Sequence, residues 1–164
     1  MRSVLALVLV TLTSGAAQAA CALAPMPDKT TTLRNSFDAR MRQLGVGNWK
    51  FVVETPRGAM YSSDTTQVQF FTREVGELTE EAGLLLPPEG NPDDTVRMEA
   101  AATFLGAEIS GAPERDLQPR IVRAIAAARR NGMGQAMREN EAVLIFSSPE
   151  PGAVALVARR IRCR

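Results

Sequence analysis

Residues 113–146 read PERDLQPRIVRAIAAARRNGMGQAMRENEAVLIF and hold the two clearest secondary-structure signals in the chain. Apolar residues in the first half recur at the spacing of one helix face, and proline is favoured in a first helical turn. These apolar residues are Leu117, Ile121, Ile125 and Ala128. The segment ends in AVLIF, a continuous apolar run typical of a central strand that is covered on both faces. A helix from Pro113 to Arg130, ended by Gly132, and a strand over 142–146 therefore predict a mixed fold.

The chain after this strand predicts a turn and one more strand. Ser148-Pro149-Glu150-Pro151-Gly152 is rich in turn formers, and residues 153–163 then alternate. Val157, Ile161 and Cys163 fall on one face of that strand, which we expect to be the buried face. Between the helix and the strand at 142–146, Met133 and Met137 indicate a short extra turn of helix.

Upstream, residues 30–44 have apolar residues at helical spacing, and two glycines follow them. Residues 49–54 alternate so that Trp49, Phe51 and Val53 share one face of a strand, and a second strand is expected over 59–62. A Thr-Pro-Arg-Gly sequence between them is typical of a type I turn.

Residues 65–86 fit either a helix or a strand. We expect a strand over 66–71, because its residues are strand formers, and then a helix over 73–84 capped by Thr72. A further helix is expected from Asp94, as its cap, to Leu105. The fold prediction is therefore α+β, one domain with a mostly antiparallel sheet of four or five strands and three or four helices.

The first residues have the features of a secretory signal peptide. Arg2 precedes a nine-residue apolar run from Val4 to Leu12, and Ala17-Gln18-Ala19 matches a signal-peptidase site. Nine residues are too few to span a bilayer, which needs about 20. We expect residues 1–19 to be a signal peptide and 20–164 to be one domain, located in the periplasm or secreted, with no transmembrane segment after cleavage.

The two cysteines, Cys21 and Cys163, allow two interpretations. Paired cysteines are the usual outcome in an oxidising compartment, so we expect a disulfide that joins the ends of the mature chain. Alternatively, Cys21 lies close enough to the cleavage site to carry a lipid anchor, although Gln18 stands where such signals usually have an aliphatic residue.

Composition excludes several classes of function. The chain has no histidine, which removes Ser-His-Asp and Cys-His catalysis and histidine-ligated zinc. Its net charge of +1 argues against non-specific nucleic-acid binding. Asp93 and Asp94 lack the ligand spacing of a calcium loop, so we expect no metal and no cofactor.

Charge is nevertheless unevenly distributed along the chain. Residues 74–108 hold nine acids against one arginine, whereas residues 109–164 hold ten arginines against five acids. Two groups of arginines are candidate partner-binding residues, because each shares a face of its element opposite the expected core. They are Arg120, Arg123 and Arg130 on the helix and Arg160 and Arg162, followed by Arg164, on the last strand.

Two hypotheses for function follow from these observations. The first is an exported, non-enzymatic binding domain that acts on another envelope macromolecule, a protein or a glycan, as an inhibitor, immunity protein or assembly factor would. The alternative is a carboxylate-dependent hydrolase of cell-wall glycan, in which Glu54 and Asp64 converge across a hairpin. Trp49 and Tyr61 are the only large amphipathic aromatic residues near these two acids.

Overall fold

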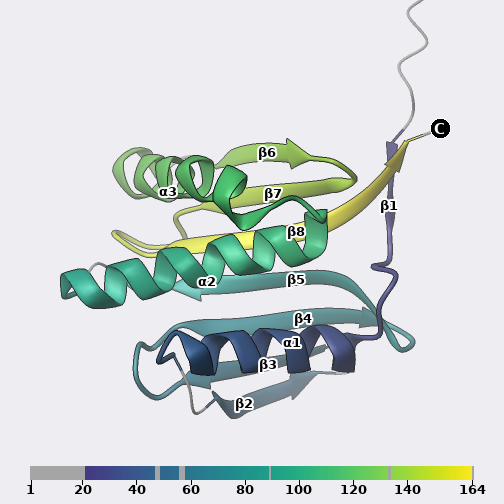
Figure 1. Ribbon diagram of the computed structural model, residues 1–164, viewed down its shortest axis with the longest axis horizontal. Helices are drawn as coiled ribbons and strands as arrows, with labels where there is room; N and C mark the ends of the chain where they lie inside the picture. The colour runs from purple at the N-terminus through teal and green to yellow at the C-terminus, as the bar shows by residue number, and fades with distance from the viewer. Residues whose placement is uncertain (1–20, 47–48, 56–57, 89, 133, 164) are drawn as a thin grey trace, which may run out of the picture.

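The computed structural model describes residues 21–46, 49–55, 58–88, 90–132 and 134–163. Within this part of the chain there are three helices and eight strands (Figure 1). The elements, in chain order, are β1 (Cys21–Ala24), α1 (Thr30–Gln43), β2 (Trp49–Thr55), β3 (Gly58–Ser63), β4 (Gln69–Val75), β5 (Leu78–Leu86), α2 (Pro92–Ser110), α3 (Glu114–Asn131), β6 (Gln135–Glu139), β7 (Ala142–Ser147) and β8 (Val154–Cys163). The expected signal peptide lies outside the described residues.

All described strands belong to one antiparallel sheet in the order β2-β3-β4-β5-β8-β7-β6, with β1 paired to the end of β8. The three helices lie on the same face of this sheet: α1 over the β3–β4 side, α2 across the middle and α3 over the β6–β7 side (Figure 1). The predicted α+β class and antiparallel sheet are confirmed. The predicted number of strands was too low, because β1, β5 and β6 were not expected.

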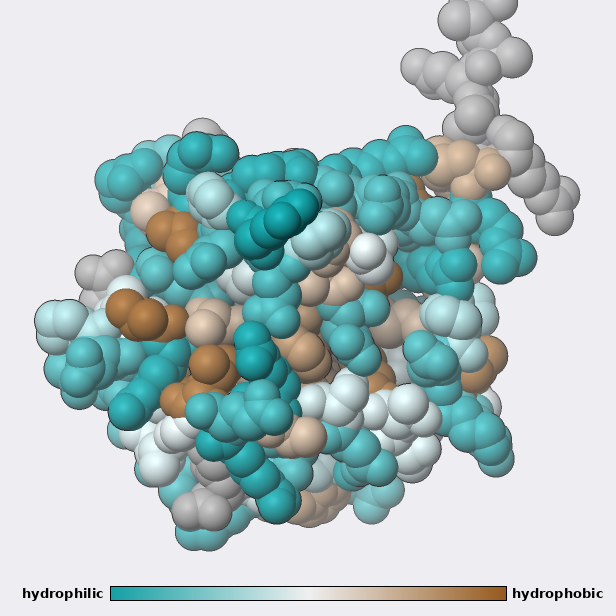
Figure 2. All heavy atoms as spheres, viewed as in Figure 1, coloured by the Kyte–Doolittle hydropathy of each residue, from teal (hydrophilic) through white to brown (hydrophobic). Residues whose placement is uncertain are grey.

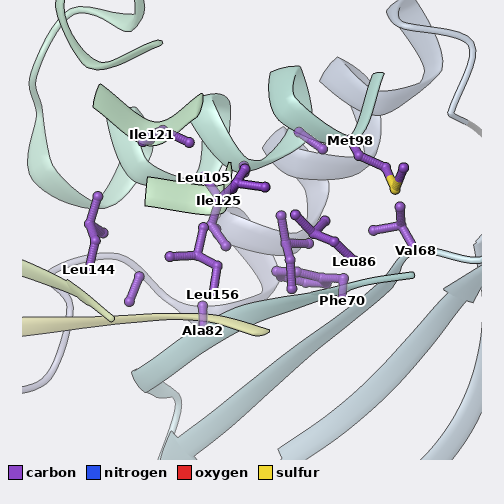
Figure 3. Close-up of a cluster of buried hydrophobic side chains, with 14 of the residues drawn as sticks. Val68, Phe70, Ala82, Leu86, Met98, Leu105, Ile121, Ile125, Leu144 and Leu156 are labelled. Carbon is purple, nitrogen blue, oxygen red and sulfur yellow. The ribbon is translucent and has the colours of Figure 1, made fainter. Parts of the chain in front are cut away.

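The core lies between the helices and the sheet (Figure 3). Ile121 and Ile125 of α3 and Leu105 of α2 are buried against Leu144 of β7 and Leu156 of β8. The predicted helix therefore exists with the expected buried side. It ends at Gly132, whose φ of 63° is the left-handed conformation that glycine adopts without strain.

The helix predicted over 73–84 with Thr72 as its cap is wrong, because these residues form the hairpin of β4 and β5. Gly76, which a helix would carry in its interior, has a φ of 63° in the turn that joins the two strands. A glycine at positive φ favours such a turn, whereas inside a helix it is destabilising. The short helix expected around Met133 and Met137 is wrong for Met137, which lies in β6, and Met133 lies outside the described residues.

The face of β8 that is buried differs from the prediction. Val154, Leu156 and Ala158 are the buried residues, whereas Val157 and Ile161 lie on the opposite face, which no described helix covers. β7 behaves in the same way: its buried and half-buried residues alternate, so it is covered on one face and not on both. Ile145 consequently lies on the open face, half-buried.

Cys163 is exposed, contrary to the predicted inward orientation, yet the disulfide with Cys21 is present. β1 runs antiparallel to the end of β8, and this register brings Cys21 directly opposite Cys163. Pairing across the two strands, and not burial, therefore brings the sulfur atoms together. The Cys21 sulfur that forms this bond is not available to carry a lipid.

β2 is an edge strand, and its pattern is interrupted by a bulge. Phe51 pairs with Tyr61 and Val53 with Met60, so Val52 is the additional residue. The bulge moves Val53 to the face opposite Phe51, and the predicted common face of Trp49, Phe51 and Val53 is broken at Val53. All three residues 51–53 of this edge strand are exposed.

Candidate functional site

The five arginines predicted to bind a partner divide into paired and unpaired groups. Arg120 forms an ion pair with Glu139 of β6, and Arg160 forms one with Glu141 in the β6–β7 turn. Arg123, Arg130 and Arg162 are exposed, and no carboxylate among the described residues lies within ion-pair distance of them. The two ion pairs hold Arg120 and Arg160 against β6 and the β6–β7 turn, whereas the unpaired side chains are available for contacts with a partner.

Glu141 shows the electrostatic effect of this arginine group. The hydrogen bond from the Arg160 guanidinium, followed by the positive charge of Arg160, lowers the pKa of Glu141, and the charge of Arg162 lowers it further. The carboxylate is therefore ionised throughout the neutral range and neutralises part of the charge on β8. Arg162 acts on Glu141 only through its charge, and the hydrogen-bond donors of its side chain have no partner among the described residues.

A basic hollow of about 410 Å³ lies between α3 and β6. Three arginines line it: Arg120, Arg123 and Arg138. Arg120 is neutralised by Glu139, whereas Arg138 donates to the Cys163 sulfur at 3.0 Å, an interaction that leaves its charge uncompensated. The hollow thus presents net positive charge at one edge of the sheet.

The structure does not bring Glu54 and Asp64 together. Glu54 pairs with Ala59 at one end of the β2–β3 hairpin, whereas Asp64 follows Ser63, which pairs with Trp49 at the other end. About five residues of strand, roughly 17 Å, separate the two positions, and a glycosidase requires carboxyl groups about 5–10 Å apart. Asp64 instead forms an ion pair with Lys50 at 2.7 Å.

An aromatic cleft that the sequence did not predict lies between α1 and the β2–β3–β4 part of the sheet. It has a volume of about 410 Å³. Its lining residues are Arg34, Asn35, Phe37, Asp38, Arg42, Trp49, Tyr61 and Phe70. The pairing of Tyr61 with Phe70 across β3 and β4 places both rings on the helix-covered face.

Ring contacts make the wall of the aromatic cleft continuous. The Phe37 ring stacks on Phe70 with centroids 4.4 Å apart and lies 5.6 Å from Trp49. The Arg34 guanidinium carbon lies 4.5 Å from the centroid of Tyr61, a cation–π contact. Trp49 and Tyr61, the amphipathic aromatic residues of two neighbouring strands, are the signal in the sequence that could have indicated this cleft.

A second hollow, lined by Phe51, Glu54 and Glu74 among others, shares Arg34 and Tyr61 with the aromatic cleft. Its two glutamates make it acidic. Arg34 and Tyr61 therefore form a boundary between an aromatic cleft and an acidic hollow. Seen from the helix side, apolar residues elsewhere form only small patches between hydrophilic ones (Figure 2).

Three further observations bear on function. No helix in the described part of the chain has the length and apolar character needed to cross a membrane. Among the same residues, no three histidine, cysteine, aspartate or glutamate side chains gather in a group that could hold a metal ion. No protein-family model, curated protein or solved structure matches the chain.

Proposed function

We propose that this chain is an exported, non-enzymatic binding protein that recognises an anionic region of another envelope macromolecule through the arginines of α3 and β8. The observation that carries the proposal is the basic hollow between α3 and β6, with Arg123 exposed on its rim and without a carboxylate partner among the described residues. Arginine suits such a surface because its planar guanidinium forms forked hydrogen bonds with carboxylates and phosphates and is weakly hydrated. Periplasmic or secreted location is part of the same proposal and is supported by the disulfide.

The separation of Glu54 from Asp64 favours binding over glycan hydrolysis. A hydrolase of the expected type needs both carboxyl groups on one sugar ring, and the β2–β3 register holds them at opposite ends of a hairpin. Arg123 and Arg130, by contrast, project from a helix whose opposite side is firmly packed, so both can contact a partner without loss of the core.

Affinity capture from a native envelope extract, with the wild-type protein and an Arg123→Glu/Arg130→Glu variant as bait, tests the proposal. A partner retained by the wild type should bind the variant at least about tenfold more weakly in a purified binary assay, because like charges then oppose each other. The affinity should also fall as salt rises, since screening shortens to about 8 Å at physiological ionic strength. The matched control is Glu54→Gln/Asp64→Asn, which should bind normally.

Two results would contradict the proposal. One is an unchanged affinity of the arginine variant for every partner that the wild-type protein retains. The other is cleavage of cell-wall glycan that depends on Glu54 or Asp64, which would establish the hydrolase hypothesis in its place.

A further inference from the structure

We propose that the aromatic cleft is a second binding site and that it takes a carboxylate group carried on an apolar body. Its volume of about 410 Å³ lies within the range of small-molecule sites, which is roughly 300–1,000 Å³. The apolar body would contact the partly exposed rings of Trp49 and Tyr61, which pack on the buried rings of Phe37 and Phe70. Sites of this kind bind through apolar walls and use a few polar groups to fix the orientation of the ligand.

The unpaired charged group that the cleft offers to a ligand is the Arg34 guanidinium, a donor. Arg34 has no carboxylate within ion-pair distance among the described residues. The Nε1 of Trp49 also lacks an acceptor among them, but this atom is buried and does not reach the cleft surface. Among the described residues, Asp38 is the only acid that lines the cleft, and its ion pair with Arg42 at 2.7 Å neutralises it. The uncompensated charge at the cleft is therefore positive, which fits an anionic acceptor.

The contact between Arg34 and Tyr61 orients the guanidinium for this role. A guanidinium that lies over an aromatic ring keeps its N–H groups, which point outward in its own plane, free for a carboxylate. Holding the side chain against the ring also reduces the conformational entropy that is lost when a ligand binds. Lysine could not reproduce this geometry, because its ammonium group is neither planar nor forked.

The neighbouring acidic hollow limits which anions fit. Glu54 and Glu74 lie on the far side of Arg34 and Tyr61, so a ligand with a second negative charge in that direction would be repelled. A monocarboxylate avoids this repulsion. Two sources share this chemistry, a free aromatic or aliphatic acid and the C-terminal residue of a polypeptide, whose chain would continue past exposed Phe51.

Fluorescence titration tests the site directly, because Trp49 is the only tryptophan of the chain and lines the cleft. The probes are 3-phenylpropionate, 3-phenylpropionamide and 3-phenylpropylamine, which present a carboxylate, a neutral amide and a cation on the same ring. We expect a saturable change in emission with the carboxylate, weaker binding of the amide, and the weakest binding of the amine. A second arm compares acetyl-Val-Val-Phe with its C-terminal amide. If Phe51→Ala weakens binding of the peptide but not of 3-phenylpropionate, the source of the carboxylate is a polypeptide. If the peptide binds Phe51→Ala and the wild type equally well, the source is the free acid.

Arg34→Ala should weaken binding of the carboxylate about tenfold or more, and Arg34→Lys should restore only part of the loss. Arg123→Ala is the matched control, since Arg123 lines the basic hollow and not this cleft. It should leave the titration unchanged, just as Arg34→Ala should leave capture of the envelope partner unchanged. The proposals for the two sites can therefore be contradicted independently of each other.

Three results of the titrations would overturn the inference. They are no saturable change with either carboxylate probe up to about 10 mM, equal affinities for the carboxylate and the amide, and an Arg34→Ala variant that is folded by circular dichroism and binds as the wild type does. Amide hydrogen exchange tests whether a second copy of the chain covers this part of the sheet instead of a ligand. Protection of β2 that grows with protein concentration in the absence of any probe would assign this edge to a second copy of the chain and would also overturn the inference.

Discussion

Individual apolar residues in this chain differ in burial according to the face of the sheet on which they lie. Leu156 and Val157 are neighbours of similar hydrophobicity, but Leu156 is fully buried beneath the helices and Val157 lies half-buried on the open face. The middle of that open face is itself apolar, because Val157 pairs with Ile145 of β7. Hydrophobicity alone therefore could not indicate which set of alternate residues faces the helices, and the predicted orientation of β8 was wrong for this reason.

Ile121→Ala and Ile145→Ala should show this difference in energy. Ile121 is 0% exposed, so we expect its loss to lower the free energy of unfolding by about 2–5 kcal/mol, as large-to-small changes in a core do. Ile145 is only half-buried, and its substitution should cost about half as much or less, since solvent already reaches the site. Chemical denaturation measures both values.

Arg123→Ala is the control for these substitutions and should change stability by less than about 0.5 kcal/mol, because Arg123 is exposed. A cost at Ile145 equal to that at Ile121 would mean that the open face is covered in solution.

For helices and strands, the prediction from sequence was most accurate where the residue pattern fitted only one type of secondary structure. The stretch that became α3 combines helical spacing with a glycine stop, and both features exist in the structure. The hairpin of β4 and β5 was missed because its apolar residues also fall at helical spacing, and local pattern cannot choose between the two periods. Pairing with β8 decides in favour of strands, and that partner lies about 70 residues further along the chain.

The start of α2 provides a test of one element. The sequence predicted Asp94 as the cap, but Asn91 is the N-cap: its side-chain oxygen accepts a hydrogen bond from the Asp94 amide at 2.9 Å, and Pro92 follows in the first turn. Asn91→Ala should therefore lower the free energy of unfolding by about 1 kcal/mol, because the backbone N–H of Asp94 loses its hydrogen-bond acceptor and has no partner within the helix.

Asp93→Ala is the matched control for the cap, since Asp93 lies in the same turn and acts only through its charge on the helix dipole. Its cost should stay within about 0.3–1 kcal/mol and fall as salt is added, whereas the cost of Asn91→Ala should not depend on salt. Thermal or denaturant unfolding at two salt concentrations distinguishes these outcomes. Equal, salt-dependent losses would mean that Asn91 is not the effective cap.

On the scale of the whole molecule, the two candidate sites lie at opposite edges of one sheet. The basic hollow is on β6 and the aromatic cleft is beside β2, and the strand order places five strands between these two edges. Arg120 and Arg123 of the first site could be predicted, because their charge and their helical spacing are visible in the sequence, whereas Arg138 of β6 was not among the predicted residues. The aromatic cleft could not, since it requires residues of α1, β2, β3 and β4 to meet on one face of the sheet, and this meeting depends on the pairing of strands.

The disulfide is the feature that joins the two ends of the described chain. Cys21 and Cys163 are 142 residues apart, so the bond removes a large amount of conformational freedom from the unfolded state. By the loop-entropy relation, a Cys21→Ser/Cys163→Ser variant should lose about 4–5 kcal/mol of stability. The fold itself should persist, because both cysteines are exposed and the core does not include them.

Denaturation of the wild-type protein with and without reductant should reproduce the loss seen in the double variant, and the variant should not respond to reductant. Leu23→Ala serves as the control for contacts of β1 as such. It should cost about 0.5 kcal/mol or less, because Leu23 is 52% exposed. Intact mass after alkylation checks the bond directly: protein from an oxidising compartment should show no free thiol. Two alkylated cysteines, or a midpoint that reductant does not shift, would contradict the account in which this bond holds β1 to β8.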